Sequence, residues 1–291
     1  MGIQIVSETE LAKAQQVVIA EVRYTAEYNA PCPNLVEKFT LRQGEKQITV
    51  PKVGQMDATA LTDGQDMTSS EDIGMTSVDL TTGEVGLKVI LTDKLIRQEK
   101  AELYRVIGRQ MGDAMARKKD KDIIALFDDF TADDLGGTTK TLSLANLAGC
   151  ITYARVQKFP QPIAVVHRPE TVYDLTSAIT ITTAALFPMP HGYAEDLLKD
   201  FWALTFDGIA IIRDGNIAKN AGSVTNDAYG AIFSKAALCI VESLAPRTER
   251  ERDASLRATE VVMVSDYGCF VLDDSYGATM LYDATTVTTN A

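Results

Sequence analysis

A long segment without proline constrains this chain more than any other feature of its sequence. No proline occurs from Asp93 to about Phe130, Thr92 suits the position that caps a helix, and Asp93 falls in the first turn. Apolar residues recur in this segment at helical spacing: Leu95, Ile96, Leu103, Ile107, Met111, Ala114 and Met115. One helix over the whole segment would reach roughly 57 Å at 1.5 Å per residue. Such a helix is longer than a small domain is wide.

Two features inside this segment leave its continuity open. The charged run Arg117–Asp122 indicates either a bend, which would divide the helix in two, or a solvated face. Gly108 and Gly112 lie four residues apart, and each costs about 1 kcal/mol relative to alanine in a helix interior. They indicate either a face where another backbone approaches closely or a simple kink.

The amino-terminal region predicts a helix that stands apart from the rest of the chain. Ser7 and Glu10 form a capping box at the start of an amphipathic pattern that continues to about Tyr28. Pro31 and Pro33 then keep the next residues out of a helix. We therefore expect an amino-terminal helix joined to the remainder by an extended arm, which needs something to pack on.

The region from Phe39 to Val89 predicts a long β-loop. Residues 39–50 alternate apolar and polar side chains around the turn Gln43–Gly44, which is typical of a β-hairpin. A polar stretch rich in Gly, Ser, Thr and Asp follows, and strand-like alternation returns from Val78 onwards. A loop of this length is unusual inside a compact domain and is normally functional or disordered.

The second half of the chain predicts a mixed fold of the α+β class. The pattern favours a helix from Leu142 to about Lys158, a short strand over Ile163–Val166 and a helical turn or two over Pro169–Ala178. Short β-rich runs bounded by Gly or Asp follow: GIAIIRDG, YGAIFS, ALCIVES, EVVMVSD, CFVLDD and ATMLYD. Many late strands with two or three helices indicate an α+β domain.

The charge balance argues against strong binding to nucleic acid or to a membrane surface. The chain holds 28 Lys and Arg against 40 Asp and Glu, a net charge of −12, so contact with DNA should be weak and incidental. The sequence carries neither a signal peptide nor a run of apolar residues long enough to span a bilayer. Three of the four cysteines lie in apolar contexts and are interpreted as small core residues of a protein from a reducing compartment: Cys150, Cys239 and Cys269.

Three patterns that could carry chemistry do not amount to an active site. The two histidines, His167 and His191, have no recognisable catalytic partner motif, so we interpret them as a strand-end and a turn residue. In Gly136–Thr141 (GGTTKT), Thr139 stands where a phosphate-binding loop requires glycine before lysine. An acidic cluster lacks the ligand spacing of a calcium loop and indicates a solvated helix end: Asp128, Asp129, Asp133 and Asp134. We predict no catalytic residues, no cofactor and no metal.

The order of these parts resembles the Hong Kong 97 fold of tailed-bacteriophage major capsid proteins over nearly the whole chain. The most similar stretches are KLIRQEKAELYRVIGRQMGDAMARKKDKDIIALF, PIAVVHRPETVYDL and the segment from Ala236 to Asp274. The resemblance implies five parts, which are an amino-terminal arm (1–38), an extended β-loop (39–92), the spine helix of a peripheral domain (93–135), an α/β axial domain (136–239) and strands that return to both domains (240–291).

The resemblance also implies a function and partners. It implies a structural protein, not an enzyme, that forms hexamers and pentamers in an icosahedral head around double-stranded DNA. Scaffolding, portal and decoration proteins are possible partners, no membrane is involved, and the virion is assembled in the host cytoplasm. The alternatives are an encapsulin-like nanocompartment, which shares the fold, and an oligomeric α/β enzyme. We expect the arm to be docked and assembly to be guided by a separate scaffolding protein or by the shell itself.

The run Arg247–Asp253 (RTERERD) supplies the candidate contact between subunits. As a strand, it places Glu249, Glu251 and Asp253 on one side and Arg250 and Arg252 on the other, with Arg247 at its start. A strand charged on both faces cannot be buried unless every charge is paired. The alternatives are a solvated edge strand or loop, or a subunit contact, and we favour the contact. Reversing Arg250 and Arg252 to Glu should then slow assembly and leave subunit melting nearly unchanged.

Overall fold

Two long antiparallel strands near the carboxyl end organise the molecule. The computed structural model describes residues 30–54, 56, 58, 60, 63–64, 74–93, 102–132, 134–175, 205–219 and 226–285. Strands β10 (Leu238–Asp253) and β11 (Ala258–Val271) pair with each other over nearly their whole lengths. β1 (Glu37–Thr40) runs parallel to the start of β10, and β4 (Gly83–Thr92) runs antiparallel to β11. The resulting sheet has the order β1-β10-β11-β4.

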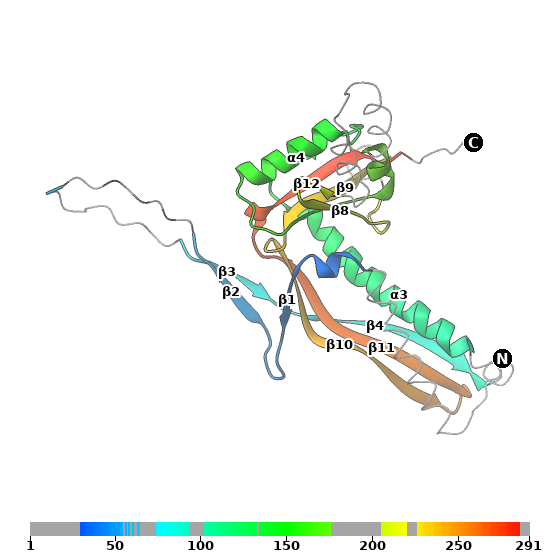
Figure 1. Ribbon diagram of the computed structural model, residues 1–291. Coiled ribbons are helices and arrows are strands. Elements are labelled where there is room, and N and C mark those ends of the chain that lie inside the picture. Colours follow the sequence, from blue (N-terminus) through cyan, green and yellow to red (C-terminus); the bar gives the residue numbers. More distant parts are fainter. Residues whose placement is uncertain are drawn as a thin grey trace, which may run out of the picture.

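The predicted long helix lies along one face of this four-stranded sheet (Figure 1). It is α3 (Glu102–Ala125), and it continues into the 3-10 helix η2 (Leu126–Asp129). Met111 and Met115 of the predicted stripe are buried and belong to the same core as Met263 of β11. α3 is continuous through Arg117–Asp122, so this run does not divide it. Residues 94–101 lie outside the described part of the chain.

A six-stranded sheet forms the second half of the molecule, at one end of α3 (Figure 1). Its strands, in spatial order, are β5 (Leu135–Gly136), β12 (Gly277–Asp283), β9 (Asp227–Ser234), β6 (Ile163–His167), β8 (Ile209–Arg213) and β7 (Thr205–Phe206). Helix α4 (Leu144–Val156), which the sequence pattern predicted, covers this sheet. Ser143 caps the helix by accepting a hydrogen bond from Asn146 N–H at 3.2 Å. The α+β fold class is confirmed.

The chain crosses between the two sheets twice near the carboxyl end. β9 leads into β10 through residues 235–237, and β11 leads into β12 through the 3-10 helix η3 (Asp274–Tyr276). One buried core holds residues of α3 and η2 together with residues of both sheets. The two halves therefore pack against each other and are not joined by a loose linker.

The hairpin predicted over residues 39–50 is wrong. The turn at Gln43–Gly44 is present, and Gly44 adopts a positive φ of 95° there. However, β2 (Ile48–Lys52) pairs with β3 (Thr76–Leu80), whereas β1 pairs with β10. The reason is burial, because this arrangement packs Leu41 next to the turn against Leu80 and Val241 in one small core. The ribbon β2–β3 projects away from both sheets (Figure 1).

The late β-rich runs form fewer and longer strands than their spacing predicted. Runs ALCIVES and RTERERD both belong to β10, and runs EVVMVSD and CFVLDD both belong to β11. The pairing of β10 with β11 is irregular between Glu242 and Arg247, a stretch that contains Pro246. This irregularity interrupts the alternation of apolar and polar residues. The sequence pattern therefore predicted two strands where the structure has one.

Several predicted elements cannot be compared with the structure. The amino-terminal helix Ser7–Tyr28 and the outer part of the β-loop lie outside the described residues, apart from a few positions of the loop. The helix expected from Pro169 is helical over 169–175, where the described stretch ends. Among the described helices, none has both the length and the apolar character needed to cross a membrane.

Candidate assembly surface

The charged run predicted as a subunit contact lies on a sheet edge. Within the described residues, β1 pairs with β10 only as far as Glu242, so the outer half of β10 is bonded on one side, to β11. No described strand pairs with its other side, which is the arrangement of an edge strand. Five of the six candidate residues are exposed, and Asp253 is half-buried. We call the segment Arg247–Asp253 the charged edge.

The register with β11 shows which side of the sheet each charge takes. Arg250 lies opposite Val261, which packs into the core beneath α3. Glu251, the next residue, lies opposite Glu260 on the other face. The predicted alternation is therefore present: Arg250 and Arg252 lie on the side of α3, and the glutamates of the charged edge lie on the open side.

Arg252 already has a partner inside its own chain. Its two terminal nitrogens donate to the two carboxylate oxygens of Asp93 at 3.0 and 3.2 Å, the bidentate geometry that makes such pairs strong. Asp93 is 6% exposed, and this pairing raises the pKa of Arg252. Sequence reasoning placed Asp93 in the first turn of a helix and missed this contact. The only sequence signal for this ion pair was the acidic side chain of Asp93 next to the end of a strand.

Two further residues of the charged edge also have roles inside the chain. Arg247 forms an ion pair with Glu249 at 2.5 Å, although both side chains are more than half exposed. Asp253 accepts hydrogen bonds from the Ser255 hydroxyl at 2.6 Å and from the N–H groups of Ser255 and Leu256 at 2.8 and 3.1 Å, which lowers its pKa and shapes the turn between β10 and β11. These residues are fixed by local contacts.

Arg250 and Glu251 remain as the charges available to a neighbour. Neither makes an ion pair within the part of the chain that the structure describes. Glu251 also faces the like charge of Glu260 across the strand pair, although Lys88 of β4 neutralises Glu260 at 2.5 Å. A cation from another molecule would remove the remaining repulsion at Glu251.

The residues that were considered for catalysis have structural roles where they are described. His167 is fully buried in β6, its Nδ1 accepts a hydrogen bond from Arg168 N–H at 2.8 Å, and burial lowers its pKa to about 4. In the loop 136–141, Thr139 N–H donates to the buried carboxylate of Asp227 at 3.2 Å. Asp128, Asp129 and Asp134 are exposed, in line with a solvated helix end. His191 and Asp133 lie outside the described residues.

One buried polar cluster stands apart from these. Single side-chain atoms of Cys32, Asp120 and Asp214 lie within 4.8 Å of one another. These side chains are engaged in hydrogen bonds with one another and with Asn216. The arrangement in the described structure is therefore that of a hydrogen-bonded joint between elements.

Comparison with solved structures identifies the fold. The capsid of the cyanophage P-SCSP1u aligns with a TM-score of 0.61 and 18% identity over 86% of this chain and 87% of that chain. The acid-stable capsid of Helicobacter pylori bacteriophage KHP30 aligns with a TM-score of 0.68 and 11% identity over 88% and 92%. The mature capsid of bacteriophage PhiM1 gives 0.61 and 13% over 91% and 88%. The fold is that of a capsid shell subunit.

The family follows from the sequence itself. A family model described as phage capsid protein matches residues 43–281, so this chain belongs to the phage capsid protein family. A search among curated proteins found no match. The predicted Hong Kong 97-like fold is confirmed, and the protein is a structural component of a phage capsid and not an enzyme.

Proposed function

We propose that this chain assembles as hexamers and pentamers into an icosahedral phage head that encloses double-stranded DNA. The observation that carries this proposal is the ribbon β2–β3. A two-stranded ribbon is marginally stable by itself, and the residues near its outer end are apolar yet exposed: Val53 (52%), Met56 (55%) and Met75 (68%). Exposed apolar groups of this size gather at contacts between proteins. A neighbouring subunit would cover them.

The remaining parts of the proposal rest on family membership and on charge. Some parts of the chain would contact neighbouring subunits, and others would form the core of the subunit. These parts are the arm (1–38), the extended loop (39–92), the spine (93–135), the axial domain (136–239) and the returning strands (240–291). The net charge of −12 fits a wall that encloses DNA while touching it weakly. Scaffolding, portal and decoration proteins and assembly in the host cytoplasm belong to the same proposal. The family match favours a phage head over a nanocompartment.

We further propose that the charged edge of β10 contacts a neighbouring subunit through Arg250 and Glu251. The expectation for Arg252 changes, because a glutamate there would face the nearly buried carboxylate of Asp93 and destabilise the subunit itself. Arg250 alone is therefore the informative position.

Arg250→Glu is expected to slow assembly while leaving the melting temperature of unassembled subunits unchanged. The physical reason is that an exposed pair contributes only about 0.2–1 kcal/mol, but a shell repeats it many times. Light scattering should show the slowing most clearly at low salt, where charges are least screened. Lys235→Glu, the same charge change at an exposed turn, serves as the matched control and should assemble normally. Normal assembly of Arg250→Glu at every salt concentration would place the contact elsewhere.

A further inference from the structure

Three buried polar residues meet where three separate parts of the fold join. Cys32 belongs to the 3-10 helix η1 (Cys32–Asn34) at the end of the arm, Asp120 lies within α3, and Asp214 follows β8 of the six-stranded sheet. Their exposed fractions are 0%, 0% and 3%. Asp120 is also the buried member of the charged run that was interpreted as a bend or a solvated face. Its burial needs a physical explanation, because buried carboxylates are costly.

Each hydrogen-bond donor in this cluster is electrically neutral. Asp120 accepts from Cys32 N–H at 3.1 Å through Oδ1 and from the Asn216 side-chain amide at 2.8 Å through Oδ2. Asp214 accepts from Asn216 N–H at 2.8 Å through Oδ1, and the Cys32 thiol donates to its Oδ2 at 3.4 Å. An oxygen of Asp120 and an oxygen of Asp214 lie within 4.8 Å of each other, so the two carboxyl groups interact directly in this buried cluster.

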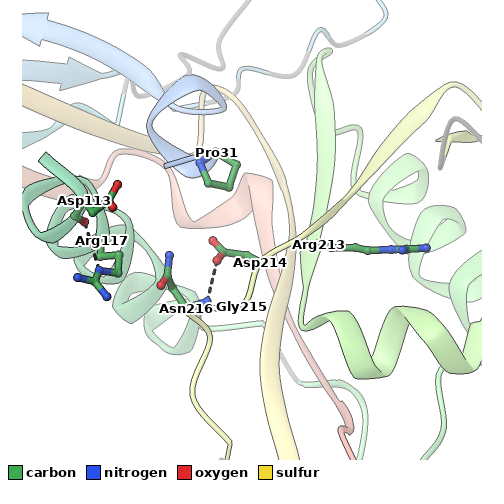
Figure 2. Close-up of a pocket in the computed structure, with 7 residues that line it drawn as sticks. All are labelled: Pro31, Asp113, Arg117, Arg213, Asp214, Gly215 and Asn216. Carbon is green, nitrogen blue, oxygen red and sulfur yellow. Dashed lines mark hydrogen bonds between the residues drawn. The ribbon is translucent and has the colours of Figure 1, made fainter. Parts of the chain in front are cut away.

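No cation of the surrounding elements compensates for the two acids in the described structure. The cluster borders a cavity of about 540 Å³ whose lining includes Asp113, Arg117 and Arg213 (Figure 2). Arg117 donates through Nε to the backbone oxygen of Asp113 at 3.2 Å, and the Arg213 side chain points away from Asp214 (Figure 2). Neither forms an ion pair with Asp120 or Asp214. Two ionised carboxylates at this place would therefore repel each other in a poorly solvated site.

We propose that Asp120 and Asp214 share one proton, and that this proton-bridged pair fastens the amino-terminal arm to the spine helix and the six-stranded sheet. Burial, and next the neighbouring carboxyl group of Asp214, raise the pKa of Asp120 to about 7. The Cys32 thiol stays protonated, since burial and the two acids raise its pKa as well. When the shared proton leaves for solvent, two buried anions remain and the joint weakens.

The direction of the pH dependence follows from this shift. An unfolded aspartate titrates near pH ~3.9, whereas Asp120 in the fold titrates at about 7. The contribution of the joint is therefore complete below pH ~3.9 and is lost as the pH rises through about 7. The joint should hold in acid and loosen at mildly alkaline pH.

Infrared spectroscopy of the full-length protein tests the shared proton directly. The wild type should show the C=O absorption of a protonated buried carboxyl group that disappears with a midpoint near pH 7. Asp214→Asn should lack this band, because the N–H of the introduced amide takes the place of the proton while the amide oxygen still accepts from Asn216 N–H. Asp113→Asn, a charge removal on the same helix and cavity, is the matched control and should keep the band.

Hydrogen exchange at the Cys32 amide tests the fastening role. After correction for the intrinsic effect of pH, protection of this amide in the wild type should fall about tenfold between pH 6 and pH 8, following the protonated fraction of a group with a pKa near 7. Asp214→Asn should keep its protection at both values, because no proton remains to be lost. Peptides covering residues 30–36 are sufficient for the measurement.

The proposal is overturned by any of three results. The first is a wild type without a protonated carboxyl band at pH 5–6, a measurement that depends on no variant. The second is a band that persists unchanged in Asp214→Asn or, should that variant not fold, in Asp120→Asn. The third is stabilisation of the wild type, but not of Asp214→Asn, by added Zn²⁺ or Ca²⁺, which would make a metal and not a proton the shared cation.

Discussion

Replacing Phe127 by alanine is expected to lower the free energy of unfolding of the subunit by about 3–5 kcal/mol. Phe127 is fully buried in η2, and its ring lies 5.4 Å from that of Phe233 in β9. The core around it includes residues of α3 and of both sheets. Truncation would therefore leave a cavity at the place where the two halves of the molecule meet, and the rigid surroundings could not collapse into it.

Urea unfolding of dissociated subunits measures this effect. Phe127→Leu should lose less, since most of the apolar volume remains. Leu256→Ala removes an apolar side chain that is 54% exposed in the turn between β10 and β11, and it should change stability by less than about 0.5 kcal/mol. A loss below about 1 kcal/mol for Phe127→Ala would show that this residue does not join the two halves.

Removal of residues 54–74 is expected to abolish normal shells while leaving the subunit folded. The core that anchors the ribbon lies at its base, where Ile48, Val50 and Val78 pack around Leu80. The deleted segment is mostly polar in sequence, and shortening a loop changes its closure entropy only slightly. The intersubunit contacts that we assign to the loop would be lost completely.

The deletion should join Val53 to Met75 through Asn-Gly, a sequence that favours a tight hairpin turn. Urea unfolding should give a midpoint close to that of the wild type, and electron microscopy should show no regular shells. In a second variant, a Gly/Ser linker of equal length replaces residues 54–74. This variant keeps the length of the loop but loses its side chains, so comparing the two variants shows which loss prevents assembly. Normal and equally stable shells from both variants would disprove the extended-loop assignment.

The sequence predicted the helices of this fold well because their signals are local. The spacing of Met111 and Met115 identified the buried face of α3, and the helical pattern from Leu142 to about Lys158 predicted α4. Strand pairing depends on contacts between distant residues, and there the local pattern failed. The turn at Gln43–Gly44 predicted a hairpin, but burial of Leu41 and Val241 favours the pairing of β1 with β10.

The candidate surface was predictable only in part, for the same reason. The alternation of charges in Arg247–Asp253 gave the sides of the strand correctly, since that property has a period of two residues. The partner of Arg252 is Asp93, which lies 159 positions away, and no local pattern connects them. Asp120 shows the opposite error, because a run of charges indicates solvent, whereas this one side chain turns inward to meet Cys32 and Asp214.

Electron microscopy of the purified full-length protein, combined with sedimentation, tests the central claim most directly. We predict capsomers or closed shells with masses of millions of daltons, because the exposed ends of the ribbon β2–β3 and the charged edge of β10 need neighbouring subunits. The assembled fraction should increase with protein concentration. A folded, full-length protein that stays monomeric at every concentration and salt condition would contradict the account.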